Sequence, residues 1–292
     1  MSTNKFATNA LHAGHDTTKN AGTRAVPIYQ TTSYVFNNSD HAANLFGLAE
    51  AGFIYTRLNN PTNDILEQRL AKLEGGIGAV VTASGTAAIS TALLTLLKAG
   101  DHIVASNSLY GGTYNLLNVT LPRLGITTTF VDPSNPENFL NAAQENTRVF
   151  FAESLGNPKL DVLDLKAISK AAQTYKVPFI VDNTVATPFL LNPIEHGANI
   201  VIHSLTKYIN GSSDTVGGVT CASQEFINSL KNVNDGASML LGPTMDSLRS
   251  ASVMKNMRTL HIRMKQHSHN AMYLANKFEA DGIKTVYPGL AS

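Results

Sequence analysis

Short, mostly apolar runs alternate with helix-like patterns along the chain from residue 79 onward. Such runs are typical of strands buried on both faces of a sheet, and the segments between them repeat apolar residues at helical spacing. The predicted strands are 79–82, 102–106, 127–131, 149–153, 177–182 and 200–203. The predicted helices are 62–74, 87–98 and 165–175. This alternation predicts an α/β fold with a mostly parallel sheet covered by helices on both sides.

The two ends of the chain follow other patterns. Residues 1–58 mix turn formers with short apolar pieces, which predicts an irregular arm that packs on a neighbouring subunit. Residues 59–245 form the predicted main domain. Residues 246–292 are largely helical and end in a tyrosine-proline-glycine segment at 287–289 that resembles the entry to a strand. We therefore expect the start of a smaller C-terminal α/β domain that this chain, apparently truncated, does not complete.

Composition narrows the possible functions. The 292 residues are 43% hydrophobic and 15% charged, as in an ordinary globular protein, and the net charge is +1. No basic excess indicates nucleic-acid binding, and no apolar run reaches the ~20 residues of a membrane span. The single cysteine, Cys221, fits a reducing compartment, and the polar N-terminus shows no secretion signal. The expected location is the cytoplasm.

The stretch 200–208 carries the clearest candidate chemistry. A buried strand ends there in Ser204, Thr206 and Lys207. Desolvation favours a neutral lysine amine, which forms a Schiff base with an aldehyde, and hydroxyl groups can hold a phosphate. These features together suggest pyridoxal 5'-phosphate (PLP), an aldehyde that carries a phosphate. The alternative is a surface lysine that simply closes a strand.

Two other predicted strand ends add polar groups. Ser84, Gly85 and Thr86 precede a predicted helix whose N-terminal N–H groups suit a phosphate, although small residues at such turns are often structural. Asp182 follows an apolar strand, where a carboxylate needs a cation such as the protonated pyridine nitrogen of PLP. The alternative for Asp182 is a helix N-cap or a turn residue.

Two further candidates lie after predicted strands. Tyr110 precedes two glycines and could lie against a flat heterocycle, or it could be a core aromatic residue. Asn157 could donate a hydrogen bond to a cofactor oxygen or to the substrate, or it could be a turn residue before proline. His261, His267 and His269 match no metal-ligand spacing, so no metal is expected.

Taken in chain order, several segments resemble the Cys/Met-metabolism family of PLP enzymes. These segments are 26–34, 55–62, 83–89, 109–113, 153–158, 181–184 and 203–208. The resemblance implies the large domain of the aspartate-aminotransferase fold (PLP fold type I), with PLP as the cofactor.

The resemblance also implies roles for single residues. Lys207 forms the Schiff base and shuttles protons, Asp182 pairs with the pyridine nitrogen, and Tyr110 stacks on the ring and assists at the γ-leaving group. Gly85 and Thr86, with Ser84, Ser204 and Thr206, surround the phosphate. Tyr55 and Arg57 reach the cofactor of a neighbouring subunit, which implies a homo-oligomer, a dimer of dimers in this family.

The activity that the resemblance implies is γ-replacement on an O-acylated homoserine with sulfide or a thiol, as in O-acetylhomoserine sulfhydrylases of methionine biosynthesis. The segments 26–34 and 153–162 favour this type, whereas 239–245 and 266–271 resemble methionine γ-lyases. Gly112 replaces a cysteine found in many bacterial methionine γ-lyases. Elimination by a methionine or cystathionine γ-lyase, or cystathionine γ-synthase activity, are the enzymatic alternatives.

A non-catalytic alternative also remains. The family's arginine for the substrate carboxylate lies in the C-terminal domain, beyond Ser292 of this chain. A PLP-binding or subunit-interaction protein without turnover is therefore the hypothesis from a different functional class.

Overall fold

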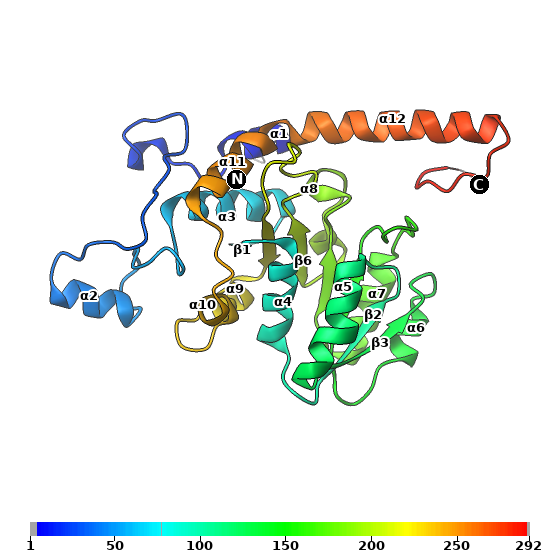
Figure 1. Ribbon diagram of the computed structural model, residues 1–292, viewed down its shortest axis with the longest axis horizontal. Coiled ribbons are helices and arrows are strands. Elements are labelled where there is room, and N and C mark those ends of the chain that lie inside the picture. Colours follow the sequence, from blue (N-terminus) through cyan, green and yellow to red (C-terminus); the bar gives the residue numbers. More distant parts are fainter. Residues whose placement is uncertain (1–4, 77, 291–292) are drawn as a thin grey trace.

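A seven-stranded sheet forms the centre of the computed structural model, which describes residues 5–76 and 78–290 (Figure 1). The strand order is β1-β7-β6-β5-β4-β2-β3. The strands are β1 (Gly78–Thr82), β2 (His102–Ser106), β3 (Thr127–Val131), β4 (Thr147–Glu153), β5 (Phe179–Asp182), β6 (Ile200–Ser204) and β7 (Gly218–Ala222). Every strand predicted from the sequence is present, with shifts of one or two residues at its ends.

The sheet is mostly parallel, as predicted, with one reversed strand. β2 to β6 pair in parallel, whereas β7 pairs antiparallel with both β1 and β6. The reversal follows from the connection, because residues 205–217 between β6 and β7 contain no crossover helix and the chain returns directly. All strands other than β7 therefore end at the same edge of the sheet.

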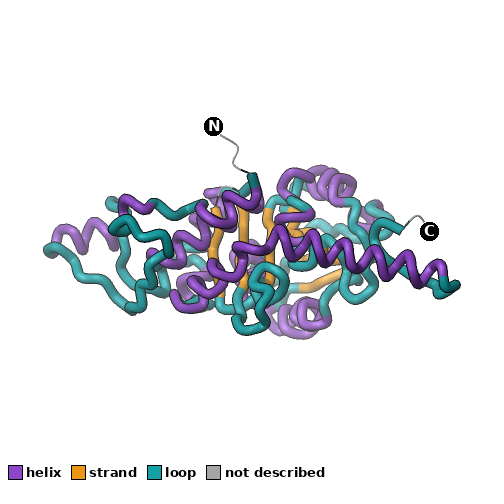
Figure 2. The backbone as a smooth tube through the Cα atoms, turned by 90° about the horizontal axis from the view of Figure 1, so that it is seen from above, coloured by secondary structure: helices purple, strands orange, loops and turns teal. Residues whose placement is uncertain are grey.

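Helices cover both faces of the sheet (Figure 2). Successive strand residues point to opposite faces, so on β4 Phe151 packs under one helical layer and Phe150 under the other, both fully buried. The layer over Phe151 contains α4 (Gly85–Leu96), η2 (Leu116–Thr120), η3 (Leu121–Leu124) and α9 (Gln224–Leu230). The opposite layer contains α1 (Phe6–His12), α3 (Pro61–Glu74), α6 (Glu137–Asn141), α7 (Leu165–Tyr175), α11 (Ser247–Asn256), η5 (Met257–Thr259) and α12 (Leu260–Ala280).

The remaining short helices lie in the connections. They are η1 (Thr17–Lys19), α2 (Ser39–Phe46), α5 (Gly111–Asn115), α8 (Thr187–Leu190), η4 (Pro193–His196) and α10 (Ala237–Leu241).

Capping residues explain where α3 and α4 begin. The Asn60 side chain accepts the Thr62 N–H before Pro61, and Gly75 ends α3 with a φ of 74°. The Ser84 side chain accepts the Ala87 N–H and thereby starts α4. Helix α4 ends at Leu96, two residues before the predicted end at Lys98, because Leu97 takes an extended conformation.

The arm and the C-terminal segment differ in how they pack. Helix α1 packs on α3 through the fully buried Ala10, whereas the segment with α2 extends away from the sheet (Figure 1). Helix α12 extends in the opposite direction from α2, to the right in the view of Figure 1. Residues 287–290, the segment that resembles the entry to a strand, form a turn, and no strand follows within the described residues. Within 5–76 and 78–290, no helix has the length and apolarity needed to cross a membrane.

Candidate active site

A cavity of about 940 Å³ opens at the carboxyl ends of the strands, the position where open α/β sheets bind ligands. All of the predicted site residues except Tyr55 and Arg57 line it: Ser84, Gly85, Thr86, Tyr110, Asn157, Asp182, Ser204, Thr206 and Lys207. These residues are up to 123 positions apart in the chain (84 to 207), and the common direction of the strands brings them together.

Asp182, the last residue of β5, is held by a residue that the sequence analysis gave no role. The Thr184 backbone N–H and hydroxyl both donate to Asp182 Oδ1, at 3.0 and 2.6 Å. The same hydroxyl accepts the Ser204 N–H at 2.7 Å and so connects β5 to β6. Burial raises the pKa of Asp182, while the bonds from Thr184 and the nearby His203 act in the opposite direction. A carboxylate in this environment suits a cationic ligand atom.

The N-terminus of α4 lies against the end of β6. A Cβ on Gly85 would lie 2.8 Å from the Ser204 Cβ, so glycine is required for this approach. The helix N-terminus and the Ser204 hydroxyl therefore face one cavity, which suits a phosphate. The Thr206 hydroxyl is engaged within the chain, since it donates to the Gly217 carbonyl at 3.2 Å and accepts the Gly217 N–H at 3.1 Å.

Lys207 lies on the turn after β6, and its side chain is exposed to the cavity. The expectation that Lys207 is buried at the end of a strand is therefore wrong for the chain by itself, because β6 ends at Ser204, three residues earlier. Arg263 of α12 fixes this turn by donating to the carbonyls of Tyr208, at 2.6 Å, and Ile209, at 3.2 Å. The backbone is thus held while the amine remains accessible.

Tyr110 and Asn157 line the cavity from two loops, and the backbone of both loops is hydrogen-bonded to the carboxyl group of Glu153. Tyr110 immediately precedes α5 and is 55% exposed, so it is not the core aromatic residue of the alternative interpretation. Glu153, at the end of β4, accepts its backbone N–H at 2.7 Å. Burial, and then the charge of Asp182, raise the pKa of Glu153 to about 8. Glu153 begins the family-like segment 153–158, but no local sequence pattern predicted a role for it.

Glu153→Gln is expected to change how the stability of the cofactor-free protein depends on pH. The unfolded carboxyl loses its proton near its ordinary pKa of 4.5, whereas the folded one keeps it up to about 8. Wild-type stability should therefore fall as pH rises through this window, and glutamine removes that contribution. Melting temperatures at pH 5 and pH 8 test this, with the exposed Glu225→Gln as the control. An equal change in Tm for all three proteins would contradict it.

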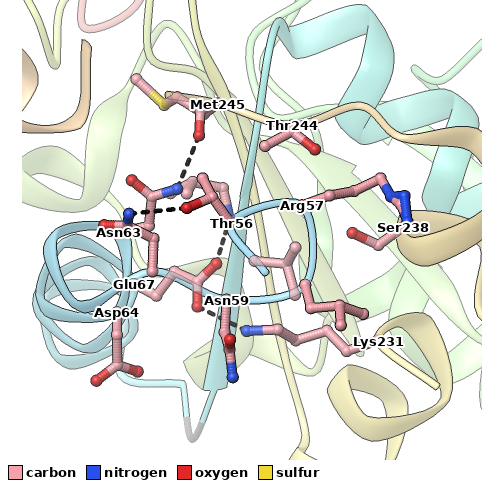
Figure 3. Close-up of a pocket in the computed structure, with 14 residues that line it drawn as sticks. Thr56, Arg57, Asn59, Asn63, Asp64, Glu67, Lys231, Ser238, Thr244 and Met245 are labelled. Atoms are coloured by element: carbon pink, nitrogen blue, oxygen red, sulfur yellow. Dashed lines mark hydrogen bonds and ion pairs between the residues drawn. The ribbon is translucent and has the colours of Figure 1, made fainter. Parts of the chain in front are cut away.

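Tyr55 and Arg57 lie outside the large cavity. Both are exposed, and the Arg57 guanidinium lies 5.3 Å from the centre of the Tyr55 ring. Arg57 also borders a separate pocket of about 20 Å³ behind β1, with room for about one water molecule (Figure 3). That pocket is structural, since its Glu67 pairs with Lys231 at 2.9 Å and accepts the Val81 N–H at the sheet edge.

Of the three histidines of α12, one lines the large cavity. His267 lines the large cavity and contacts the Tyr208 ring edge-on, with centroids 5.5 Å apart. His261 and His269 do not line this cavity. Over residues 5–76 and 78–290, no group of three histidine, cysteine or acidic side chains is placed to hold a metal ion.

Comparison with known sequences gives consistent results. The family model described as "Cys/Met metabolism PLP-dependent enzyme" matches residues 7–292. An O-acetyl-L-homoserine sulfhydrylase of Leptospira meyeri is 45% identical over 99% of this chain and 74% of its own length. An L-methionine gamma-lyase of Fusobacterium nucleatum is 43% identical over 99% of this chain and 74% of its own length.

Solved structures agree with the fold. An O-acetylhomoserine (thiol)-lyase structure from Campylobacter jejuni, with an N'-pyridoxyl-lysine-5'-monophosphate residue, has a TM-score of 0.87 and 36% identity and covers 94% of this chain and 75% of that one. The metB structure of Corynebacterium glutamicum has a TM-score of 0.89 and 33% identity over 99% of this chain and 71% of that one. The α/β fold class predicted from the sequence is confirmed.

Proposed function

The chain belongs to the Cys/Met-metabolism family of PLP-dependent enzymes, and from that premise we propose that it catalyses γ-replacement on an O-acylated homoserine with sulfide or a thiol. The cofactor is PLP. The observation that carries the proposal is the cavity lined together by the exposed Lys207, by the half-buried Asp182 at the end of β5 and by the helix N-terminus at Gly85.

The donor set fits PLP. Asp182 would hold the protonated pyridine nitrogen, and the N-terminus of α4 with Ser84, Gly85 and Thr86 would hold the phosphate. The Ser204 hydroxyl would assist, as would that of Thr206 once it turns from the Gly217 carbonyl. Tyr110 would cover the ring, and Asn157 would donate to the phenolic oxygen. When bound, PLP supplies an electron sink for the charge that develops at the substrate carbons.

The chain's own residues would then move protons and orient groups. The Lys207 amine takes the α-proton of the substrate, and proton transfer at the β-carbon follows before the γ-substituent leaves. Tyr110 lines the cavity, and its hydroxyl would assist departure of the γ-substituent. Arg263 holds the turn of Lys207, so the amine returns to the same position after each transfer.

Elimination from methionine or cystathionine is the second candidate, because L-methionine gamma-lyases are also among the relatives. The environment of Tyr110 favours replacement. A Cβ at Gly112 would lie 2.4 Å from the Tyr110 Cε1, so the cysteine that many bacterial methionine γ-lyases carry there would require the exposed Tyr110 ring to shift.

Product analysis separates these activities. With O-acetylhomoserine and sulfide, the PLP-loaded protein should form homocysteine and acetate in equal amounts. With methionine it should release little 2-oxobutanoate and ammonia. Efficient release from methionine, without homocysteine formation from the first pair, would establish elimination instead. Stable cofactor binding without either product would support the non-catalytic alternative.

We also propose an organisation for the chain and its assembly. Residues 1–58 serve as the arm toward a neighbouring subunit, 59–245 as the PLP-binding domain and 246–292 as the beginning of a C-terminal domain. The active unit is a homo-oligomer, a dimer of dimers, with Tyr55 and Arg57 at the neighbour's cofactor phosphate. The buried free thiol of Cys221 supports a cytoplasmic location.

Mixing two inactive variants tests whether sites are shared. Arg57→Ala lacks the arginine of the arm, and Lys207→Ala lacks the amine of the cavity. If Arg57 serves a neighbour, a hybrid dimer contains one complete site, and random mixing should restore roughly a quarter of wild-type activity. Turnover after joint refolding measures this. No recovery, despite demonstrated hybrid formation, would place Arg57 and Lys207 in the same subunit's site.

A further inference from the structure

Glu153 occupies a position in the cavity wall that the proposed chemistry leaves without a use. It is the last residue of β4 and is 7% exposed. In the β4–β5 pairing it lies directly beside Asp182, so both side chains leave the same face of the sheet. In the described part of the chain, no lysine, arginine or histidine forms an ion pair with Glu153.

The carboxyl group of Glu153 connects two loops. Its Oε1 accepts the Tyr110 N–H at 2.7 Å, and the carboxyl also accepts the backbone N–H of Asn157. Tyr110 stands at the N-cap of α5, whose start has no side-chain cap. Glu153 therefore anchors the entry to α5 and the turn after β4 to the strand that adjoins Asp182.

We propose that Glu153 is a positioning residue that, in its protonated form, holds Tyr110 and the Asn157 turn in place beside Asp182. This inference rests on the proposed function, because Tyr110 and Asn157 matter only if they face the cofactor. A neutral carboxyl can still accept both N–H groups. It also leaves the negative charge at this end of the cavity on Asp182, where the cofactor nitrogen requires it.

Electrostatics support the neutral form. Two carboxylates side by side on adjacent strands repel each other, so one of them holds its proton more tightly. Burial raises the pKa of both carboxyl groups. At Asp182 the bonds from Thr184 and the nearby His203 act in the opposite direction, whereas at Glu153 the charge of Asp182 adds to burial and the pKa rises to about 8. The other titratable or charged groups that line the cavity are Tyr110, Lys207, Tyr208, Asp214, Arg263 and His267.

Two variants of the PLP-loaded full chain test the proposal. Glu153→Gln keeps a neutral acceptor and should retain kcat within about threefold of wild type at pH 7. Glu153→Ala leaves both N–H groups without this partner and should lower kcat about 10- to 100-fold while KM changes less. Glu225→Ala and Glu225→Gln, on the exposed first turn of α9, control for loss of a carboxylate.

Two further readouts separate positioning from a general loss of stability. In a Tyr110→Ala background, Glu153→Ala should lower kcat much less than it does in the wild type, because Glu153 affects turnover by positioning Tyr110. The visible circular dichroism of bound PLP should change in Glu153→Ala and not in Glu153→Gln. Wild-type kcat should also decline at alkaline pH as Glu153 loses its proton, and this decline should be weaker in Glu153→Gln.

Several results would overturn the proposal. Wild-type kcat in Glu153→Ala would exclude positioning, and a glutamine variant as impaired as the alanine variant would mean that a negative charge is needed. Additive losses with Tyr110→Ala would exclude action through Tyr110. If the wild-type protein turns over no substrate, the proposed function fails, while the dichroism of the three loaded proteins still tests Glu153. An alanine variant that does not fold leaves the decision to the pH profile of Glu153→Gln, where an unchanged alkaline decline contradicts the inference.

Discussion

Lys207→Ala is expected to abolish covalent attachment of PLP and to lower turnover by on the order of 10²–10⁴-fold from lost proton transfer alone. Lys207 is the lysine that lines the large cavity, and its turn is fixed by Arg263 while its amine is accessible. Loss of this amine removes both the covalent anchor and the group that moves the substrate protons. Visible absorption of the purified protein and single-turnover kinetics measure the two effects separately.

A matched control and a rescue sharpen this test. Lys170→Ala removes an exposed lysine from α7 that does not line the cavity, and should leave both properties unchanged. Added methylamine should restore part of the turnover of Lys207→Ala, because a free amine can replace the lost base. Normal visible absorption in Lys207→Ala would mean that another residue carries the cofactor.

Asp182→Asn is the second large effect that we expect. The asparagine side-chain oxygen can still accept the Thr184 N–H and hydroxyl, so the β5–Thr184–Ser204 connection should persist. What disappears is the negative charge that we propose pairs with the pyridine nitrogen. Hydrogen bonds to charged groups contribute about 1.5–3 kcal/mol, so PLP affinity should fall about 10- to 150-fold, and kcat should fall because the electron sink weakens.

Titration of the cofactor-free protein with PLP, followed by kcat at saturation, tests Asp182→Asn. Asp235→Asn, in an exposed turn, serves as the control for loss of a carboxylate. Unchanged affinity and unchanged kcat in Asp182→Asn would show that the carboxylate does not face the ring nitrogen. A lowered Tm with normal affinity would assign Asp182 a purely structural role.

Much of this site could be predicted from the sequence because each strand end has a recognisable pattern within a few neighbouring residues. A short apolar run followed by a polar residue marks the end of a buried strand, and parallel strands bring such ends to one edge. Asp182, Lys207 and the Ser84–Gly85 turn were found this way, and the cavity joins them. The direction of β7 was not predictable from its residues, since it depends on the length of the connection from β6.

The parts that the sequence did not reveal depend on register and distance. Glu153 adjoins Asp182 because β4 pairs with β5 in one particular register, which no local pattern specifies. Arg263 reaches the Lys207 turn from α12, 55 residues from its partner Tyr208. Exposure of Lys207 likewise depends on where β6 ends, which sequence analysis locates to within a few residues.

The position of the cofactor is the central claim, and peptide mapping tests it most directly. The protein is loaded with PLP, reduced with borohydride to fix the cofactor to its lysine, and digested for mass spectrometry. We expect a pyridoxyl phosphate group on the peptide that contains Lys207 and little elsewhere. A modification that falls on Lys231, Lys265 or another lysine in place of Lys207, or no modification after demonstrated PLP binding, would contradict it.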